Sequence, residues 1–215
     1  MAVTVRPATE ADLPQVRAIF EHYVLNTIVS FMVQRPPPDY IEQRFQEIAS
    51  RNLPYLVAVG DGGQVVGYTY AAAFRGYMLG YGHTVEISLF CHPQHTNKGV
   101  GSQMIQQLLQ MLRTTKHATK EVGHEDNVVE FDIKKVIAVM SVDESAPNSG
   151  LALRDWYLRW GFEEVVTTEP QYGHHNASVH RDEAELSGLG LDFLADRIRQ
   201  PSALYSFDRA DHFAT

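Results

Sequence analysis

The sequence predicts a single α/β domain in which helices flank a mixed, mostly antiparallel sheet. Three observations predict this fold class. Stretches with the apolar pattern of strands alternate along the chain with stretches whose apolar residues recur at helical spacing. No internal repeat interrupts this order. The 215 residues, 44% hydrophobic and 20% charged, are enough for one domain with a sizeable core.

The N-terminal part of the chain predicts an edge strand, two helices and a hairpin. Strand-like alternation comes first, two apolar stripes at helical spacing follow, and Pro36-Pro37-Pro38 separates the two helices. Gly60-Asp61-Gly62-Gly63 is a turn signal between two β-rich runs, which predicts an antiparallel hairpin. In chain order, these elements are expected at residues 3–6, 12–23, 41–48, 55–59 and 64–73.

The rest of the chain alternates strands and helices around one charged stretch. Residues 114–132 are polar and follow neither period, so they predict an exposed loop inserted into the domain. We expect the domain to cover residues 1–170, and residues 171–215 to form a C-terminal extension that contributes a helix and the last strand. The expected elements are strands 83–91, 136–142, 162–166 and 203–207 and helices 100–112, 151–160 and 189–198.

Composition narrows the classes of function. The formal net charge is −8, so the average surface repels a polyphosphate backbone, and nucleic acid is not an expected partner. The single cysteine, Cys91, cannot form an internal disulfide. Because the chain has no run of about 18 apolar residues and no signal-peptide pattern, we expect a cytoplasmic protein that does not bind membranes.

The segment from Thr84 to Ser102 carries the strongest chemical signal. It is predicted to run from a strand, through a turn that holds Gly99 and Gly101, into the start of a helix. That geometry directs several backbone N–H groups at one anion, such as a pyrophosphate. An ordinary strand-to-helix turn has the same glycine spacing, so the spacing alone leaves both interpretations open.

A family resemblance makes this signal more specific. The turn Thr96-Asn97-Lys98-Gly99-Val100-Gly101 resembles the acetyl-CoA pyrophosphate loop of GNAT acetyltransferases, Gln/Arg-x-x-Gly-x-Gly/Ala, although Thr96 departs from the first position. Other segments resemble this superfamily or its phosphinothricin acetyltransferase-like branch, in the family's order. They are Arg6–Pro14, Val29–Phe31, Gly67–Ala71, Tyr81–Glu86 and Trp156–Glu163. Asn148 is two residues too far from Tyr157 for the usual spacing.

The resemblance implies a GNAT fold and an N-acetyltransferase that uses acetyl-CoA as cosubstrate and no metal. The amine of a small amino-acid-like molecule, such as phosphinothricin or methionine sulfoximine, would attack the thioester directly in a ternary complex, as a detoxifying activity. A homodimer is also implied. The alternatives are acetylation of a polyamine, an aminoglycoside or a peptide N-terminus, and a noncatalytic acyl-CoA-binding regulator. An Arg or Lys in the pocket would favour a carboxylate-bearing substrate, and an acidic pocket would favour a polyamine.

Two residues are implied to carry the chemistry. Glu86 resembles the general base of the branch; the alternative is a strand residue that faces solvent or pairs with Arg. Tyr157 matches the position from which family members protonate the departing thiolate, and the alternative is an aromatic that packs the helix onto the sheet. No basic partner for Cys91 is evident in the sequence, so nucleophilic catalysis by its thiol is not expected.

The cofactor residues follow from the same resemblance. The strand end would pair with the pantetheine arm through its backbone, and the turn would hold the pyrophosphate. These residues are Leu89, Phe90, Cys91, Thr96, Asn97, Lys98, Gly99, Val100, Gly101 and Ser102. Lys98 would add positive charge near the phosphates, with Arg113 and Lys116 as further candidates, although an exposed helix face is the better explanation for Arg113 and Lys116.

Three further residues match the substrate pocket of the branch. Phe31, Tyr81 and His83 occupy positions that line the amino-acid pocket, with core packing as the alternative for each. The 10 histidines include His174-His175 and His180, but these lack the carboxylate or cysteine spacing of a metal site. Solvated loop histidines are therefore the expectation, and no metal centre is predicted.

Overall fold

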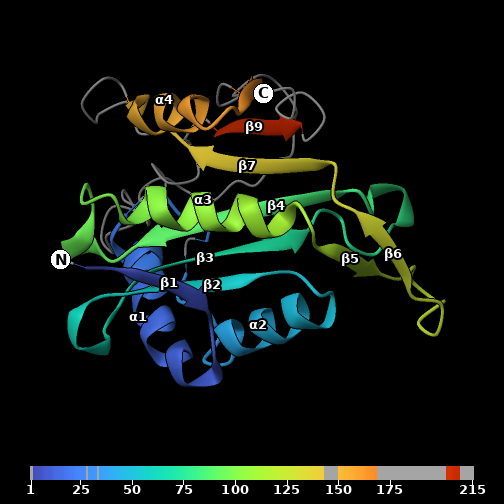
Figure 1. Ribbon diagram of the computed structural model, residues 1–215, viewed down its shortest axis with the longest axis horizontal. Coiled ribbons are helices and arrows are strands. Elements are labelled where there is room, and N and C mark those ends of the chain that lie inside the picture. Colours follow the sequence, from blue (N-terminus) through green and yellow to red (C-terminus); the bar gives the residue numbers. More distant parts are fainter. Residues whose placement is uncertain (1, 28, 33, 143–149, 169–201, 209–215) are drawn as a thin grey trace, which may run out of the picture.

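The structure, a computed structural model, describes residues 2–27, 29–32, 34–142, 150–168 and 202–208. Within them, seven strands form one sheet in the order β1-β2-β3-β4-β7-β9-β8 (Figure 1). Every neighbouring pair is antiparallel except β4 and β7, so the predicted mixed, mostly antiparallel sheet is confirmed. The strands are β1 (Thr4–Pro7), β2 (Tyr55–Val59), β3 (Val65–Ala73), β4 (Thr84–Cys91), β7 (Lys135–Ser141), β8 (Glu163–Thr168) and β9 (Ser202–Asp208).

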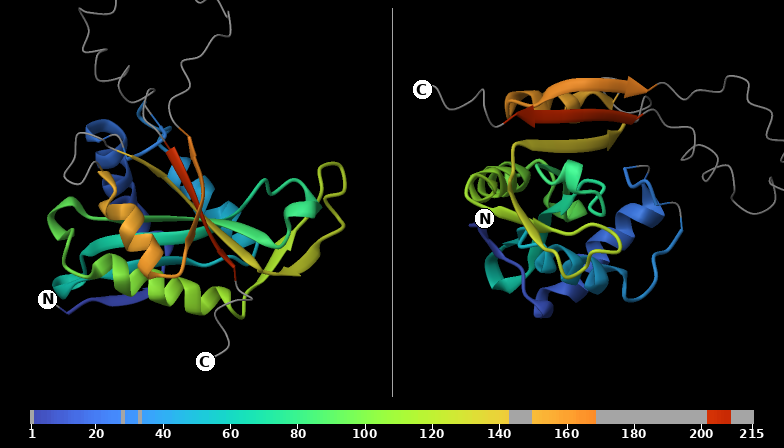
Figure 2. Two further views of the ribbon diagram at one scale, coloured as in Figure 1. Left: turned by 90° about the horizontal axis from the view of Figure 1, so that it is seen from above. Right: turned by 90° about the vertical axis from the view of Figure 1, so that its right-hand side faces the viewer.

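Helices cover both faces of the sheet (Figures 1 and 2). Helices α1 and α2 lie on one face and α3 on the other, while α4 lies beside β7 and β8. The apolar stripes predicted for α1 and α3 are buried in the core, which is what fixes these helices on the sheet. The helices are α1 (Leu13–Asn26), α2 (Tyr40–Ser50), α3 (Val100–Leu112) and α4 (Ala152–Arg159).

The alternation of β3 and β4 decides which side chains meet α1 and α2. Tyr68 lies opposite Phe90, and their rings stack with centroids 5.3 Å apart. Ala72 lies opposite Glu86 in the same register. Glu86 is four residues from Phe90 on β4, and side chains an even number of residues apart on a strand share a face, so Glu86 lies on the face of these aromatic residues. Gly67 points to the other face, where an added Cβ would lie 2.8 Å from Met104 of α3.

Strands β4 and β7 separate at the centre of the sheet. Their parallel pairing covers only residues 84–87 and 135–138, although β4 continues to Cys91 and β7 to Ser141. Beyond Ala138, the other edge of β7 remains paired with β9. Within the described ranges, the β7-side edge of residues 88–91 has no strand partner. The backbone there is free to pair with an extended ligand.

The charged stretch at 114–132 forms a hairpin, so the prediction of an exposed loop was wrong. Strands β5 (Lys116–Thr119) and β6 (Val129–Asp132) pair in an antiparallel two-stranded sheet. Each strand is only four residues long, and the hairpin is held by contacts with distant segments that local patterning does not reveal. The buried His117 ring contacts the carbonyl oxygen of Gly82 through Nδ1 at 2.8 Å, and Ala118 N–H donates to the carbonyl of Arg51 at 3.0 Å.

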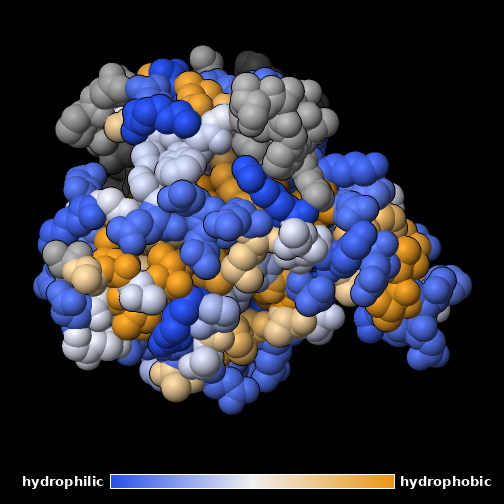
Figure 3. Space-filling model, in the orientation of Figure 1, coloured by the Kyte–Doolittle hydropathy of each residue, from blue (hydrophilic) through white to orange (hydrophobic). Residues whose placement is uncertain are grey.

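The hairpin projects from the body of the protein and exposes apolar side chains (Figures 1 and 3). Val122 and Val128, in the connection between β5 and β6, are 68% and 58% exposed. At the base of the hairpin, Phe131 packs against Gly82 so closely that a Cβ on Gly82 would lie 2.3 Å from its ring. The hairpin is thus anchored at its base and exposed at its tip.

The last described segment of the chain forms the predicted C-terminal strand. Residues 202–208 form β9 between β7 and β8, so this segment is an interior strand of the sheet. The expected helix at 189–198, Asn148, and the histidines at 174, 175 and 180 lie outside the described residues. Across the described ranges, no helix has the length and apolar character needed to cross a membrane.

Asp12 ties the first strand to the first helix, and its loss is expected to destabilise the protein. Its carboxylate accepts two hydrogen bonds from the Arg6 guanidinium, each 2.8 Å, and one from Thr9 N–H at 2.8 Å. The Arg6 hydrogen bonds lower the pKa of Asp12 against the opposing effect of burial. We expect Asp12→Asn to reduce the free energy of unfolding by about 2 kcal/mol at pH 7.

The pH dependence provides the check. Because the folded-state pKa of Asp12 is depressed, its contribution is present above the ordinary aspartate value of 3.8 and is lost as the pH falls below it. Urea denaturation should therefore show the wild-type and Asp12→Asn curves converging at low pH. Asp61→Asn, in the exposed β2–β3 turn, is the matched control, and its free energy of unfolding should stay close to that of the wild type at any pH. A difference that stays constant with pH would contradict this role.

Candidate active site

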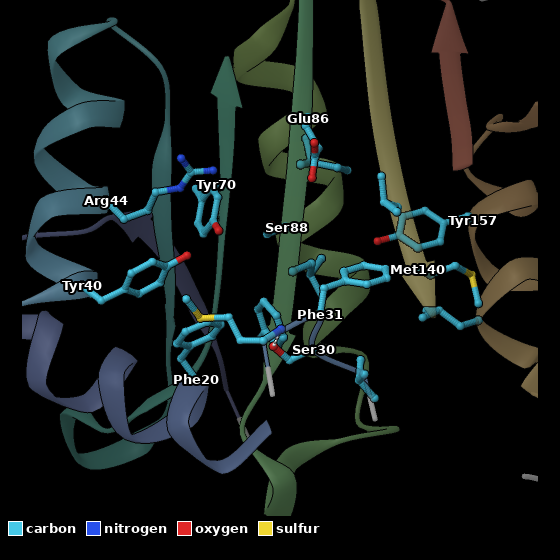
Figure 4. A pocket seen from close by; sticks show the side chains of 17 residues that line it. Phe20, Ser30, Phe31, Tyr40, Arg44, Tyr70, Glu86, Ser88, Met140 and Tyr157 are labelled. Atoms are coloured by element: carbon cyan, nitrogen blue, oxygen red, sulfur yellow. Dashed lines mark hydrogen bonds between the residues drawn. The ribbon is translucent and has the colours of Figure 1, made fainter. Parts of the chain in front are cut away.

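A cavity of about 220 Å³ opens where β4 parts from β7 (Figure 4). Its wall comes from α1, α2, residues 29–32, β3, β4, β7 and α4. In Figure 4, Tyr40, Arg44 and Tyr70 lie on one side, Tyr157 lies on the other, and Glu86 projects from β4 between them. The cavity therefore brings together both predicted catalytic residues, which are 71 positions apart in the sequence.

Glu86 is a half-buried carboxylate in the middle of β4. Its backbone is opposite Ala72 of β3 on one side and Ile137 of β7 on the other. Burial raises the pKa of Glu86, and the positive charge of Arg44 partly opposes that rise. Among the described residues, the carboxylate makes no hydrogen bond or salt bridge. A half-buried carboxylate with a raised pKa and no partner among the described residues is suited to accept a proton.

Tyr157 enters the cavity from α4, opposite Glu86. Its ring is 4.9 Å from that of Trp156 and 5.2 Å from that of Phe162, and the side chain is buried. Burial raises the pKa of Tyr157 above its ordinary value, with a smaller contribution from Cys91. The phenol therefore remains protonated at neutral pH and can act as a proton donor. Packing and proton donation are compatible in this position.

The unpaired edge of β4 leads from the cavity to the predicted phosphate loop. Leu89 and Phe90 line the cavity, and the carbonyl of Cys91 accepts a hydrogen bond from the Tyr23 hydroxyl at 2.8 Å. Burial raises the pKa of the Cys91 thiol to about 11, so the thiolate required of a nucleophile is scarce at neutral pH. The geometry favours a structural role for the Cys91 side chain.

The predicted phosphate loop has the expected strand, turn and helix start. Asn97 and Gly99 have left-handed φ angles of 58° and 77°, and α3 begins directly after Gly99. The first N–H groups of a helix lack intrahelical partners, so those of the first turn of α3 can bind an anion. Thr96, which departs from the family pattern, donates its hydroxyl to the carbonyl of Pro93 at 3.3 Å.

Helix α4 also reaches the start of α3. The Trp156 indole N–H donates to the hydroxyl of Ser102 at 3.4 Å, and an added Cβ on Gly101 would lie 3.6 Å from the Trp156 ring. The loop side chain of Lys98 donates to the carbonyl of Gln94 at 2.7 Å. At the opposite end of α3, Lys116 is paired with Asp132 at 2.7 Å, so it lies on the hairpin and not beside the loop.

The three expected substrate residues separate into two groups. Phe31 lines the cavity and is 60% exposed. The structure does not bring Tyr81 and His83 to the cavity lining. Tyr81 packs edge-on against Phe74 with centroids 5.4 Å apart, and the His83 ring contacts the backbone oxygen of Asp132 at 2.8 Å. Both lie where residues 74–83 meet the β5–β6 hairpin.

Sequence reasoning missed the cationic side of the cavity. Tyr40 and Arg44 stand one turn apart on α2, and Tyr70 reaches the cavity from β3. The spacing of Tyr40 and Arg44 places them on one helix face, which was a detectable signal. Their approach to Glu86 depends on the packing of α2 against the sheet, which the sequence pattern alone does not specify.

Comparison with known proteins decides the family. The model of the acetyltransferase (GNAT) family matches residues 17–129, which is more than half of the chain. The chain belongs to the GNAT acetyltransferase family. The splayed β4 and β7 strands and the loop before α3 thus lie in a GNAT fold.

The sequence of this GNAT chain is similar to those of two curated acyltransferases. It is 36% identical over 110 residues to phosphinothricin N-acetyltransferase of Alcaligenes faecalis, a match that covers 50% of this chain and 54% of that protein. It is 31% identical over 111 residues to the L-amino acid N-acyltransferase MnaT of Escherichia coli K12, covering 52% and 63%. The chain thus spans about half to two thirds of the length of these relatives.

Solved structures of acetyltransferases share this fold. A phosphinothricin acetyltransferase from Sinorhizobium meliloti in complex with acetyl-CoA aligns with a TM-score of 0.69 at 23% identity, covering 100% of this chain and 92% of that one. An N-acetyltransferase from Staphylococcus aureus Mu50 aligns with a TM-score of 0.67 at 18% identity, covering 97% and 99%. In the described part of this GNAT chain, no three His, Cys, Asp or Glu side chains are grouped to hold a metal ion.

Proposed function

We propose that the protein transfers the acetyl group of acetyl-CoA to the amino group of a small amino-acid-like molecule. The observation that carries this proposal is the position of Glu86, an unpaired half-buried carboxylate in the cavity where β4 and β7 separate. The names of the relatives, phosphinothricin N-acetyltransferase and L-amino acid N-acyltransferase, support an amino acid as acceptor.

The acetyl donor fits along the free edge of β4. We assign the backbone of Leu89, Phe90 and Cys91 to the pantetheine arm, which would add as a short extended segment where β7 has left the ladder. The loop from Thr96 to Ser102 would hold the pyrophosphate at the start of α3. In this arrangement the thioester would lie beside Glu86 and Tyr157.

The reaction would then proceed in one ternary complex. Glu86 accepts the proton of the substrate ammonium, directly or through water, and the neutral nitrogen attacks the thioester carbonyl. The C–N bond forms, the C–S bond breaks, and Tyr157 gives its proton to the coenzyme A thiolate. The second proton, which the nitrogen loses as it becomes an amide, returns to the Tyr157 phenolate directly or through water. A backbone N–H at residues 89–91 would polarise the carbonyl. Cys91 takes no covalent part.

Tyr157→Phe tests the proposed proton donor. The change keeps the ring that packs on Trp156 and Phe162 but removes the hydroxyl. We expect kcat to fall about 10- to 100-fold, with the acetyl-CoA dissociation constant unchanged. Tyr55→Phe is the matched control, because the buried Tyr55 hydroxyl has no hydrogen-bond partner among the described residues and lies outside this cavity. Equal kcat values for both variants would contradict the role of Tyr157.

The proposed activity is tested by coenzyme A release from acetyl-CoA with a panel of acceptors. The panel contains methionine sulfoximine, phosphinothricin and ordinary amino acids, together with polyamines, an aminoglycoside and short peptides. Turnover confined to the amino acids is expected. Preference for a polyamine or peptide would overturn the substrate class. Tight acetyl-CoA binding without turnover on any acceptor would instead favour the noncatalytic alternative.

The setting of this reaction is also part of the proposal. We propose a cytoplasmic homodimer that detoxifies amino-acid analogues and binds neither membranes nor nucleic acid. Its net charge of −8 and single cysteine support this assignment. Residues 1–170 would form the catalytic domain, and residues 171–215 an extension that supplies β9.

A further inference from the structure

The cavity that holds Glu86 contains one cation among its described lining residues, the guanidinium of Arg44. We propose that Arg44, supported by Tyr40 and Tyr70, binds the α-carboxylate of the acceptor and so selects amino acids over other amines. This inference rests on the proposed function, because it names the substrate group that the same site recognises. It adds a specificity residue on α2, a helix that the predicted motifs did not include.

The guanidinium is held in place by an aromatic ring. Arg44 Cζ lies 5.4 Å from the ring centroid of Tyr70, and Tyr70 is itself buried. The ring of Tyr55 stacks behind Tyr70 at 5.1 Å. A guanidinium that stacks on a fixed ring loses little further freedom when it binds a carboxylate, so the subsite is preorganised.

One donor of the guanidinium, the Nε–H group, has no partner among the described residues. Arg44 Nη1 donates to Glu47 at 2.9 Å, while the buried Nε has no hydrogen-bond partner within the described residues. A buried donor without a partner is unfavourable, and a carboxylate on the Nε edge would satisfy it with two parallel hydrogen bonds. Glu47 does not neutralise the subsite, because Arg51 also contacts it at 3.7 Å. Two arginines share one carboxylate.

Arg44 and Glu86 offer opposite charges to the same cavity. Tyr70 lies opposite Ser88, so Glu86 is its diagonal neighbour on the same face, about 7–8 Å away between Cα atoms. The Arg44 guanidinium lies over Tyr70, and its charge acts on the Glu86 carboxylate. A zwitterionic acceptor can place its ammonium at Glu86 and its carboxylate at Arg44. A polyamine would bring a second positive charge to Arg44, which is repulsive.

The test compares methionine sulfoximine with its carboxamide, which has the same amine and side chain but no carboxylate. In the wild type, kcat/KM for the acid should exceed that for the amide by at least about 100-fold. Arg44→Gln should lower the value for the acid about 100-fold, chiefly through KM, and change the value for the amide less than about threefold. Arg44→Lys should lie between, since it keeps the charge but loses the bidentate geometry.

Glu47→Gln separates recognition from a structural role. If Arg44 served only to anchor α2 through Glu47, removing the Glu47 charge would reproduce the loss seen in Arg44→Gln. We expect Glu47→Gln to retain the preference for the acid. The proposal is overturned if Arg44→Gln leaves the acid-to-amide ratio unchanged, or if Glu47→Gln changes it as much.

Calorimetry keeps this test independent of turnover. The wild type, Arg44→Gln and Glu47→Gln are titrated with methionine sulfoximine and with the carboxamide in the presence of coenzyme A. Failure of the wild type to acetylate any amine would overturn the proposed function. Binding of the acid that is lost only in Arg44→Gln would still support the carboxylate subsite. Equal binding of the acid by wild type and Arg44→Gln would overturn it.

Discussion

Glu86→Gln is expected to lower kcat about 10²- to 10³-fold while leaving the acetyl-CoA dissociation constant unchanged. Glutamine has nearly the same shape but cannot accept the proton of the substrate ammonium. Glu86 lines the cavity and does not belong to the loop before α3 that we assign to the pyrophosphate, so acetyl-CoA binding should be preserved. Steady-state kinetics together with acetyl-CoA titration provide the measurement. Normal turnover by Glu86→Gln would show that the base assignment is wrong.

Stability and pH dependence supply two further readouts of the same change. Burial raises the folded-state pKa of Glu86 above the ordinary value of 4.5. The ionised carboxylate therefore destabilises the folded protein at every pH above this raised pKa. At such pH values, Glu86→Gln should unfold at no lower temperature than the wild type. In the wild type, kcat should rise with pH through the raised pKa of Glu86. The facing tyrosines at 40 and 157 stay neutral in that range because burial raises the pKa of each, and Arg44, whose pKa is also raised, stays charged. The Gln variant should lack this acid limb.

Gly99→Val is expected to weaken acetyl-CoA binding at least about tenfold. Gly99 has a φ of 77°, in the left-handed region, where a β-branched residue is strained by about 1–3 kcal/mol. An added Cβ meets no atom within 4 Å, so the effect would come from the backbone and not from a clash. Relaxation of the strained loop would turn the N–H groups at the start of α3 away from the pyrophosphate.

Gly63→Val is the matched control for this prediction. Gly63 also has a left-handed φ, 83°, and open space around its Cβ position, but it lies in the turn between β2 and β3. Both variants should lose similar thermal stability, and only Gly99→Val should lose acetyl-CoA affinity in fluorescence or calorimetric titration. Equal acetyl-CoA affinity in the two variants would exclude the loop as the pyrophosphate site.

Much of the fold could be predicted because local patterns specify it. The apolar stripe of α3 and the strand that contains Glu86 are read from spacing within a few residues, and both are confirmed. The hairpin at 114–132 could not be predicted in this way. Its buried residue His117 and its packing partner Gly82 are 35 positions apart, and neither strand has a long apolar alternation.

In the candidate site, too, some residues could be predicted from the sequence and others could not. The meeting of Glu86 with Tyr157 was anticipated from family motifs, which encode long-range contacts that spacing does not. Arg44 was missed because it belongs to no motif and reaches the cavity only through the packing of α2 on β3. Tyr81 and His83 match motif positions, but the hairpin residue Phe131 packs against their segment at Gly82. Tertiary packing decided both outcomes.

Direct transfer to an amine is the central claim, and a single-turnover experiment tests it most directly. Enzyme in excess over acetyl-CoA labelled in the acetyl group is mixed with methionine sulfoximine, quenched in acid, and separated into protein and small molecules. Direct transfer predicts label in the N-acetylated amino acid and none on the protein at any time. Transient label on the peptide that contains Cys91, or label that remains in acetyl-CoA while the acceptor is bound, would contradict it.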